Sequence, residues 1–215
     1  MSCKWCHNPE SRSAGGTEYE ITAADLIKEI AKDSLFFEQS GGGVTFSGGE
    51  PFSQAAFLLE ILALCEKERI KAAIDTCGYC ETETLLKAAE KTNLFLYDIK
   101  FIDSDKHEKY CGVKNDLILS NLKALSETKT KLLIRVPVIP SINDDIPEMA
   151  GIFEFIKDFK NIETVHLLPY HNIQIDKYKR LGIQYELSDI SGDESRNMKA
   201  ISRIFEGRFR AKVGG

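Results

Sequence analysis

The chain has 215 residues, a length that suits one sizeable α/β domain, and we treat residues 1–215 as a single domain because no shift in composition divides them. Hydrophobic residues make up 43%, charged residues 28% and the net charge is −5, so the basic balance of a nucleic-acid binder is missing. No apolar run approaches the roughly 20 residues of a membrane-spanning helix, and six irregularly spaced cysteines do not suit a secreted disulfide scaffold. We therefore expect a cytoplasmic protein that acts on neither nucleic acid nor membrane.

Along the chain, amphipathic helices alternate with short apolar strands. The first helix is predicted over residues 22–37, and later helices over residues 58–65, 82–91, 116–126, 147–159 and 193–205. Strands are predicted at residues 44–46, 71–75, 94–99, 131–139 and 164–168. Short, continuously apolar strands between helices are typical of a parallel sheet buried on both faces. The sequence therefore predicts an α/β fold with five strands, and the polar residues 172–189 are interpreted as a surface loop or a lid.

Polar or glycine-containing segments lie at or near the carboxyl end of four predicted strands, and one charged residue lies within the fifth. The segments are Ser47-Gly-Gly-Glu50, Asp75-Thr-Cys-Gly78, Asp98-Ile-Lys100 and Pro169-Tyr-His171, and the charged residue is Arg135. The carboxyl ends of parallel strands meet at one rim, where α/β enzymes place their sites. Gly48 and Gly49 would let a backbone approach a ligand closely, and Glu50 could accept hydrogen bonds from an ammonium group. A plain turn that caps the next helix is the alternative for this loop.

Two Cys-x-x-Cys pairs stand out among the six cysteines. Cys3 and Cys6 are typical either of ligands to a metal or iron–sulfur cluster, or of a redox-active thiol pair. Cys77 and Cys80 form the second pair, and together the two pairs could hold a zinc ion, although their separation exceeds the roughly 12–20 residues usual in zinc modules.

The remaining cysteines and histidines give weaker signals. Cys65 lies on an apolar helix face and is interpreted as a core thiol, whereas Cys111 precedes a glycine in a predicted loop and shows no partner. His166 lies inside an apolar run, so we expect it to be a core histidine or one that supports the site. His107 lies in a charged run, so we expect it to be solvated. His171, at the rim, is the better candidate for contacting a ligand.

Six short motifs occur in one order across almost the whole chain. They are CxxCHNPE from Cys3, GGGVTFSGGEP, DTCG, YDIK, IRVPVIP and LLPYH. Together they resemble the glycyl-radical enzyme activating enzymes, radical S-adenosylmethionine (SAM) proteins typified by pyruvate formate-lyase activating enzyme. Each motif alone is modest, but six in register are specific.

The resemblance implies a fold, a cofactor pair and a reaction. The fold would be a partial (β/α)6 TIM-like barrel whose first strand is absent from this chain. In the family, a CxxxCxxC loop holds three irons of a [4Fe–4S] cluster, and SAM binds the fourth iron through its amino and carboxylate groups. Reductive cleavage of SAM then yields a 5′-deoxyadenosyl radical, which removes hydrogen from a glycine of a partner glycyl-radical enzyme. A flavodoxin- or ferredoxin-type electron donor is also implied.

Site residues carry over motif by motif. The resemblance implies Cys3 and Cys6 as cluster ligands, and Cys3, Cys6 and Lys100 as the residues that carry the reaction. The implied cofactor-binding residues are Trp5, His7, Gly48, Gly49, Glu50, Asp98, Lys100, Arg135 and His171. Some members also hold a monovalent cation, which here would involve Asp75, Thr76 and Asp98.

One departure from the family pattern concerns the cluster loop. The first of its three cysteines would lie two residues before Met1, so the sequence predicts an N-terminally truncated chain with two of three ligands and little or no activity. Cys77 is a conceivable substitute ligand. The alternatives are a zinc-binding protein that uses Cys3, Cys6, Cys77 and Cys80, and a non-catalytic remnant.

Overall fold

One open parallel sheet organises the structure, a computed structural model that describes residues 1–12, 20–190 and 197–214. Six strands follow one another in the order β1-β2-β3-β4-β5-β6, and every neighbouring pair is parallel. The strands are β1 (Gly43–Phe46), β2 (Lys71–Thr76), β3 (Leu94–Asp98), β4 (Lys131–Val138), β5 (Ile162–Pro169) and β6 (Arg210–Val213). The predicted α/β architecture is confirmed, and β1 and β6 are the two edges of the sheet.

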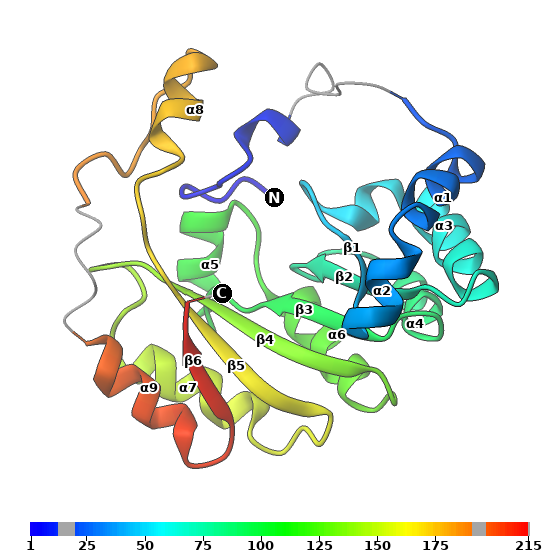
Figure 1. Ribbon diagram of the computed structural model, residues 1–215. Helices are drawn as coiled ribbons and strands as arrows, with labels where there is room; N and C mark the ends of the chain where they lie inside the picture. The colour runs from blue at the N-terminus through cyan, green and yellow to red at the C-terminus, as the bar shows by residue number, and fades with distance from the viewer. Residues whose placement is uncertain (13–19, 191–196, 215) are drawn as a thin grey trace.

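Helices connect the strands and cover the sheet, as Figure 1 shows. They are α1 (Ala23–Ala31), α2 (Ser34–Ser40), α3 (Ala55–Lys67), α4 (Thr82–Ala89), α5 (Ser104–Cys111), α6 (Asp116–Ser126), α7 (Ile146–Ile156), α8 (Ile175–Arg180) and α9 (Met198–Glu206). Two 3-10 helices, η1 (Pro9–Arg12) and η3 (Pro51–Gln54), complete the described elements. No described helix has both the length and the apolar character needed to cross a bilayer.

Sequence periodicity missed the strand at the C-terminal edge. The prediction of five strands was wrong, because β6 pairs with β5 through Thr164 opposite Arg210 and Leu167 opposite Val213. Its side chains are largely exposed and two of its four residues are basic, so it lacks the apolar run that marks the inner strands. An edge strand with one neighbour does not need to be apolar on both faces.

The helix boundaries differ most from the predictions at the first and the last predicted helix. The helix predicted over residues 22–37 is two helices, α1 and α2, separated at Lys32 and Asp33. Thr22 caps α1 as its side chain accepts a hydrogen bond from the backbone of Asp25. The last predicted helix begins at Met198, and residues 193–196 of that prediction lie outside the described residues.

The stretch predicted to be irregular, residues 172–189, contains a helix and is anchored by aromatic side chains. α8 lies within it, and Tyr178 and Tyr185 are buried with ring centroids 4.8 Å apart at 65°. They belong to a second apolar core, which comprises Trp5, Phe101, Cys111, Ile139, Tyr170, Tyr178, Tyr185 and Leu187. The main core lies between the sheet and its covering helices. The second core therefore joins the N-terminal residues to α5 and to the 170–187 segment.

We predict that Phe205→Ala strongly destabilises the fold. Phe205 lies on α9 with no exposed surface, and its ring centroid is 6.1 Å from that of Phe153. Truncating a buried phenylalanine leaves a cavity, which typically lowers the free energy of unfolding by about 3–5 kcal/mol. Urea unfolding followed by circular dichroism measures this. The control is Ile173→Ala, at a side chain that is 77% exposed, and it should change the free energy of unfolding by less than about 0.5 kcal/mol. Equal losses for both variants would contradict the assignment of the core.

Candidate active site at the carboxyl ends of the strands

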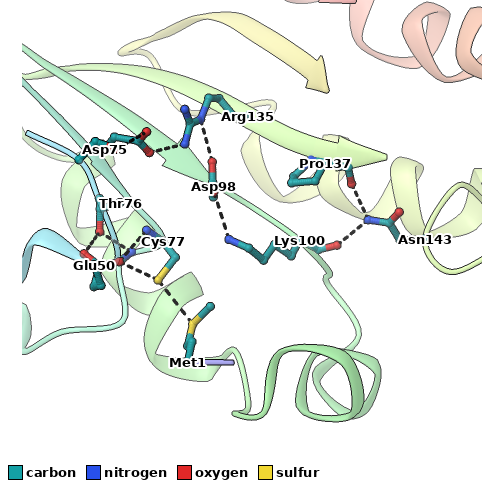
Figure 2. A network of polar contacts seen from close by, with 12 residues as sticks. Met1, Glu50, Asp75, Thr76, Cys77, Asp98, Lys100, Arg135, Pro137 and Asn143 are labelled. Atoms are coloured by element: carbon teal, nitrogen blue, oxygen red, sulfur yellow. Dashed lines mark hydrogen bonds and ion pairs between the residues drawn. The ribbon is translucent and has the colours of Figure 1, made fainter. Parts of the chain in front are cut away.

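A chain of charged side chains crosses the carboxyl ends of β2, β3 and β4. Arg135 donates from Nε to Asp98 Oδ1 at 2.8 Å, and its Nη2 bonds to Asp75 Oδ1. Lys100 Nζ lies 3.2 Å from Asp98 Oδ2. Figure 2 shows Asp98 between the two cations. The predicted convergence of Asp75, Asp98, Lys100 and Arg135 is therefore present in the structure.

Burial and opposite charge compete in this network, and the opposite charge is stronger. Burial alone would raise the pKa of Asp98, but Lys100 and Arg135 lower that pKa below its ordinary value. Burial opposes the charged form of Lys100, yet Asp98 raises its pKa above the ordinary value. The two carboxylate–cation contacts are thus ionic.

The side chain of Glu50 joins the glycine-rich loop to the turn after β2. Its carboxylate accepts hydrogen bonds from Thr76 Oγ1 at 2.7 Å, from the backbone N–H of Cys77 at 3.0 Å and from the Cys77 thiol at 2.9 Å. Burial and Glu50 raise the pKa of Cys77, so this thiol is a hydrogen-bond donor rather than a thiolate. Thr76, a predicted cation ligand, is buried and uses its hydroxyl group for Glu50 and for the backbone of Gly78.

Gly48 and Gly49 adopt a loop that larger residues would disturb. Gly48 has φ +124°, in the region that favours glycine, and a Cβ added at Gly49 would lie 3.0 Å from Ser11 Oγ. The carbonyl oxygen of Gly48 accepts a hydrogen bond from Asn8 Nδ2 at 3.2 Å. Backbone in this loop therefore lies directly against the CHNPE segment, as a shared site requires.

Cys3 and Cys6 lie on one tight turn, which is paired with the end of α5. The N–H of Cys6 donates to the carbonyl of Cys3 at 3.1 Å. On either side of Cys3, Ser2 and Lys4 donate their N–H groups at 3.0 Å to the carbonyls of Cys111 and Tyr110. Backbone hydrogen bonds to a packed helix end hold the turn next to the strand ends.

Trp5 anchors this turn in the second apolar core. Its side chain is 5% exposed, and its ring centroid lies 6.0 Å from Phe101 and 6.5 Å from Tyr110. Cys3 and Cys6 are half-buried on either side of it. Burial of Trp5, which lies between the two cysteines in the sequence, thus holds both of them on one fixed turn.

Two predictions about single residues were wrong. Cys111 is not a loop residue without a partner, since it is the last residue of α5, is fully buried and is hydrogen-bonded to Cys3 through its thiol. His107 is not solvated, because it is 1% exposed with Nδ1 2.6 Å from the carbonyl oxygen of Val113. Burial lowers the pKa of His107. Both lie on the inner face of α5, a helix too polar in sequence to reveal that face.

The two rim histidines lie together. The rings of His7 and His171 have centroids 4.5 Å apart, and Nδ1 of His171 is buried with no hydrogen-bond partner among the described residues. Burial lowers the pKa of His7, and the neighbouring His171 and Lys177 lower it further. A buried ring nitrogen without a partner leaves an unused polar atom for a ligand at this end of the site. His166 is half-buried on β5 opposite Arg135 and Cys65 is fully buried, as their interpretations as supporting and core residues require.

Metal-binding geometry is less complete than the residue types suggest. Within residues 1–12, 20–190 and 197–214, no three Cys, His, Asp or Glu side chains are grouped so that they could hold a metal ion. The four cysteines of the zinc alternative are thus not gathered, and the Cys77 thiol instead contacts Glu50 and, at 3.4 Å, the Met1 sulfur. Cys3 and Cys6 fit two ligands of an iron–sulfur cluster, while the polar residues around Glu50 and Arg135 fit an amino-acid cofactor.

Sequence reasoning missed two residues that support the site. Asn143 Nδ2 donates to the carbonyls of Lys100 at 2.9 Å and Pro137 at 2.7 Å, which fixes the backbone after β3 against the end of β4. Lys177, on α8, donates to three oxygen atoms of residues 7–10. No motif includes Asn143, and Lys177 lies in a stretch that was predicted to be irregular, so neither gave a signal.

Comparisons with known proteins agree with this geometry. The profile of the Radical SAM superfamily matches residues 1–152. The trans-4-hydroxy-L-proline dehydratase activating enzyme of Clostridioides difficile is 44% identical over 209 residues, which cover 95% of this chain and 68% of that protein. The choline trimethylamine-lyase activating enzyme of Oleidesulfovibrio alaskensis is 44% identical over 169 residues, 77% of this chain and 54% of the relative.

A solved structure extends the agreement to the fold. The crystal structure of a domain of pyruvate-formate lyase-activating enzyme from Bacteroides vulgatus superposes with a TM-score of 0.65 at 31% identity, covering 81% of this chain and 99% of that one. The chain therefore belongs to the radical SAM superfamily and, within it, to the glycyl-radical enzyme activating enzymes, which are oxidoreductases. It spans about two thirds and about half of the two curated relatives, and its open sheet fits the partial TIM-like barrel predicted from sequence.

We predict that Asp98→Asn destabilises the protein through the cations left behind. Lys100 is only 8% exposed, and loss of its carboxylate partner leaves a buried charge without compensation. Breaking a buried ion pair from one side typically costs about 3–5 kcal/mol in the free energy of unfolding, which urea titration at pH 7 measures. The control Asp176→Asn, at an exposed pair with Lys179, should cost less than about 1 kcal/mol.

The same variant should change the dependence of stability on pH. A carboxyl group whose pKa is lower in the folded state stabilises the fold fully above its ordinary pKa of 3.8, and this contribution is lost as pH falls through the folded pKa. The difference in unfolding free energy between wild type and Asp98→Asn should therefore be constant from pH 5 to 7, within about 0.5 kcal/mol, and shrink below pH 3.8. A difference that grows on acidification would contradict the ionic assignment.

Proposed function

We propose that this chain belongs to a protein that activates a glycyl-radical enzyme by reductive cleavage of SAM at a [4Fe–4S] cluster. One observation carries the proposal: Asn8, two residues after Cys6, donates to the carbonyl oxygen of Gly48 at 3.2 Å, and Glu50 at the end of that loop accepts hydrogen bonds from Thr76 and Cys77 at the end of β2. The Cys3–Cys6 turn and the charged rim are thus parts of one site. When bound, the cluster supplies the electron that breaks the bond between sulfur and C5′ of SAM.

Cofactor-binding roles follow from charge and position. Cys3 and Cys6 would hold two irons, and Trp5 would cover the same turn from the apolar side. Lys100 and Arg135 carry the positive charge that suits the carboxylate of SAM, and Glu50 carries the negative charge that suits its ammonium group. An ionised carboxylate has about four acceptor positions, and Glu50 uses four, for Thr76 Oγ1, for the N–H and thiol of Cys77 and for the N–H of Phe52. An ammonium group of SAM would therefore take the place of one of these donors. His7 and His171, together with the backbone of Gly48 and Gly49, would border the remainder of the cofactor.

Protein partners are inferred from the relatives. Because the two curated relatives are named as activating enzymes for a dehydratase and a lyase, we infer that a glycyl-radical enzyme is the protein substrate and that one of its glycines loses the hydrogen atom. A flavodoxin- or ferredoxin-type protein would supply the electron.

A monovalent cation is the least direct part of the proposal. Its expected ligands Asp75 and Asp98 are both paired with Arg135. We infer that a cation at this position would compete with Arg135 for the two carboxylates, with the hydroxyl group of Thr76 as its third neighbour.

We also infer that the 215-residue chain by itself provides an incomplete set of cluster ligands. Cys3 and Cys6 are two of the three thiolates that the family motif requires, and no described Cys, His, Asp or Glu side chain joins both of them in a group that could hold a metal ion. Cys111 is hydrogen-bonded to Cys3 without completing such a group, and Cys77 is bonded to Glu50. The expected consequence is poor cluster retention and slow SAM cleavage.

A pair of extended variants tests this inference. One adds Cys-Ala before Met1, which restores the three-cysteine spacing, and the matched control adds Ser-Ala. After anaerobic iron–sulfur reconstitution, the Cys variant should hold about four iron atoms per chain. Because outer-shell changes at metal sites already cost about 10–100-fold, loss of a direct ligand should slow 5′-deoxyadenosine formation at least ~10-fold in the Ser variant and the unextended chain. Equal iron content and equal rates in all three proteins would contradict the incomplete ligand set, and no SAM cleavage by any of them would contradict the proposed function.

A further inference from the structure

Lys177 joins α8 to the CHNPE segment across the site. Its ammonium group donates to the carbonyl of His7 at 3.0 Å, to Asn8 Oδ1 at 3.0 Å and to Glu10 Oε1 at 2.8 Å. An ammonium group has three donors, so all three are used on one short stretch of chain. The contact with Glu10 is an ion pair, and its hydrogen bond lowers the pKa of Glu10.

The segment that carries Lys177 is firmly attached. Tyr178, its neighbour on α8, is 3% exposed and packs edge-to-face against Tyr185. The hydroxyl of Tyr185 lies 2.8 Å from that of Tyr170 and accepts a hydrogen bond from the buried Gln174 at 2.5 Å. Lys177 therefore projects from a packed aromatic cluster, and its partners at residues 7–10 gain a fixed reference point.

Contacts of Asn8 extend this attachment to the glycine-rich loop. While Asn8 Oδ1 accepts from Lys177, its Nδ2 donates to the carbonyl of Gly48 at 3.2 Å. A single side chain thus connects α8, the cysteine turn and the loop that ends at Glu50. On the other side of the turn, Lys4 forms an ion pair of 2.7 Å with Glu186, which also belongs to the 170–187 segment.

We propose that Lys177 is a positioning residue that holds the Cys3–Cys6 turn in place and, through Asn8, sets the Gly48–Glu50 loop against it. Lys177 touches neither thiol and acts only through residues 7, 8 and 10. The role in cofactor binding rests on the function proposed above, whereas the role in holding the turn is a property of this chain alone.

Trp5 makes the proposal measurable without any cofactor. It is the single tryptophan of the chain and lies between the two cysteines, so its fluorescence reports on this turn alone. In Lys177→Met, which keeps the apolar stem but loses the charge, acrylamide quenching of Trp5 should increase about twofold because the turn opens locally. The matched control is Lys179→Met on the same helix, whose only described ion pair is exposed and lies 3.5 Å from Asp176. It should leave quenching unchanged.

Further variants separate positioning from general stability. Lys177→Arg keeps a cation with several donors and should restore most of the protection of Trp5. Glu10→Gln removes one charged partner and should raise quenching in the same direction but less. The urea midpoint of Lys177→Met should shift less than that of Phe205→Ala. Quenching that is unchanged in both Lys177→Met and Glu10→Gln, or raised equally by Lys179→Met, would overturn the proposal.

The Cys-extended protein provides the functional readout. There, Lys177→Met should raise the KM for SAM about tenfold and change kcat less, because a misplaced Gly48–Glu50 loop weakens binding of the cofactor before reaction. If Trp5 becomes exposed while no form of the protein cleaves SAM, the positioning role stands and the proposed function falls. If SAM is cleaved but Trp5 quenching and KM do not respond to Lys177→Met, the proposed function stands and the positioning role falls.

Discussion

The ion pairs of Asp98 with Arg135 and Lys100 are the constraint on which the site depends. They connect the ends of β3 and β4, and Arg135 extends the contact to Asp75 on β2. Without these ion pairs, two cations would lie largely buried near the carboxyl ends of the inner strands, where an isolated charge is costly. Strand pairing and charge balance therefore depend on the same side chains.

The second apolar core attaches the N-terminal residues to the rest of the protein. Trp5 is buried against α5, and the tyrosines of the 170–187 segment complete that core. Hydrophobic burial fixes the turn only approximately, because it is not directional. Directional contacts then orient the turn: backbone hydrogen bonds to Tyr110 and Cys111, and the ammonium group of Lys177 on the opposite side. The polar segment that carries Lys177 gave little signal in the sequence, yet through these directional contacts it helps to set the position of the Cys3–Cys6 turn.

Family motifs and the alternation of strands and helices made most of the rim predictable. Asp75 and Asp98 lie near the carboxyl ends of predominantly apolar inner strands, and Arg135 lies within the neighbouring strand in register with Asp98. Parallel strands bring such positions together whatever the connecting helices contain. The errors lie where that rule does not apply. β6 is an exposed edge strand, while His107 and Cys111 face inward from a helix whose other positions are charged, so local hydrophobicity did not reveal their burial.

By itself, the sequence determined the α/β class, the order of the motifs, the family and the residue types available for chemistry, because these depend on local patterns and on identities along the chain. Tertiary structure alone decided which of those residues touch. Arg135 and Asp75 are 60 positions apart, and Lys177 and Glu10 are 167 apart, so no local periodicity could pair them. Such contacts arise from the packing of the whole sheet and both cores, which sets the distance between groups that the chain itself keeps far apart.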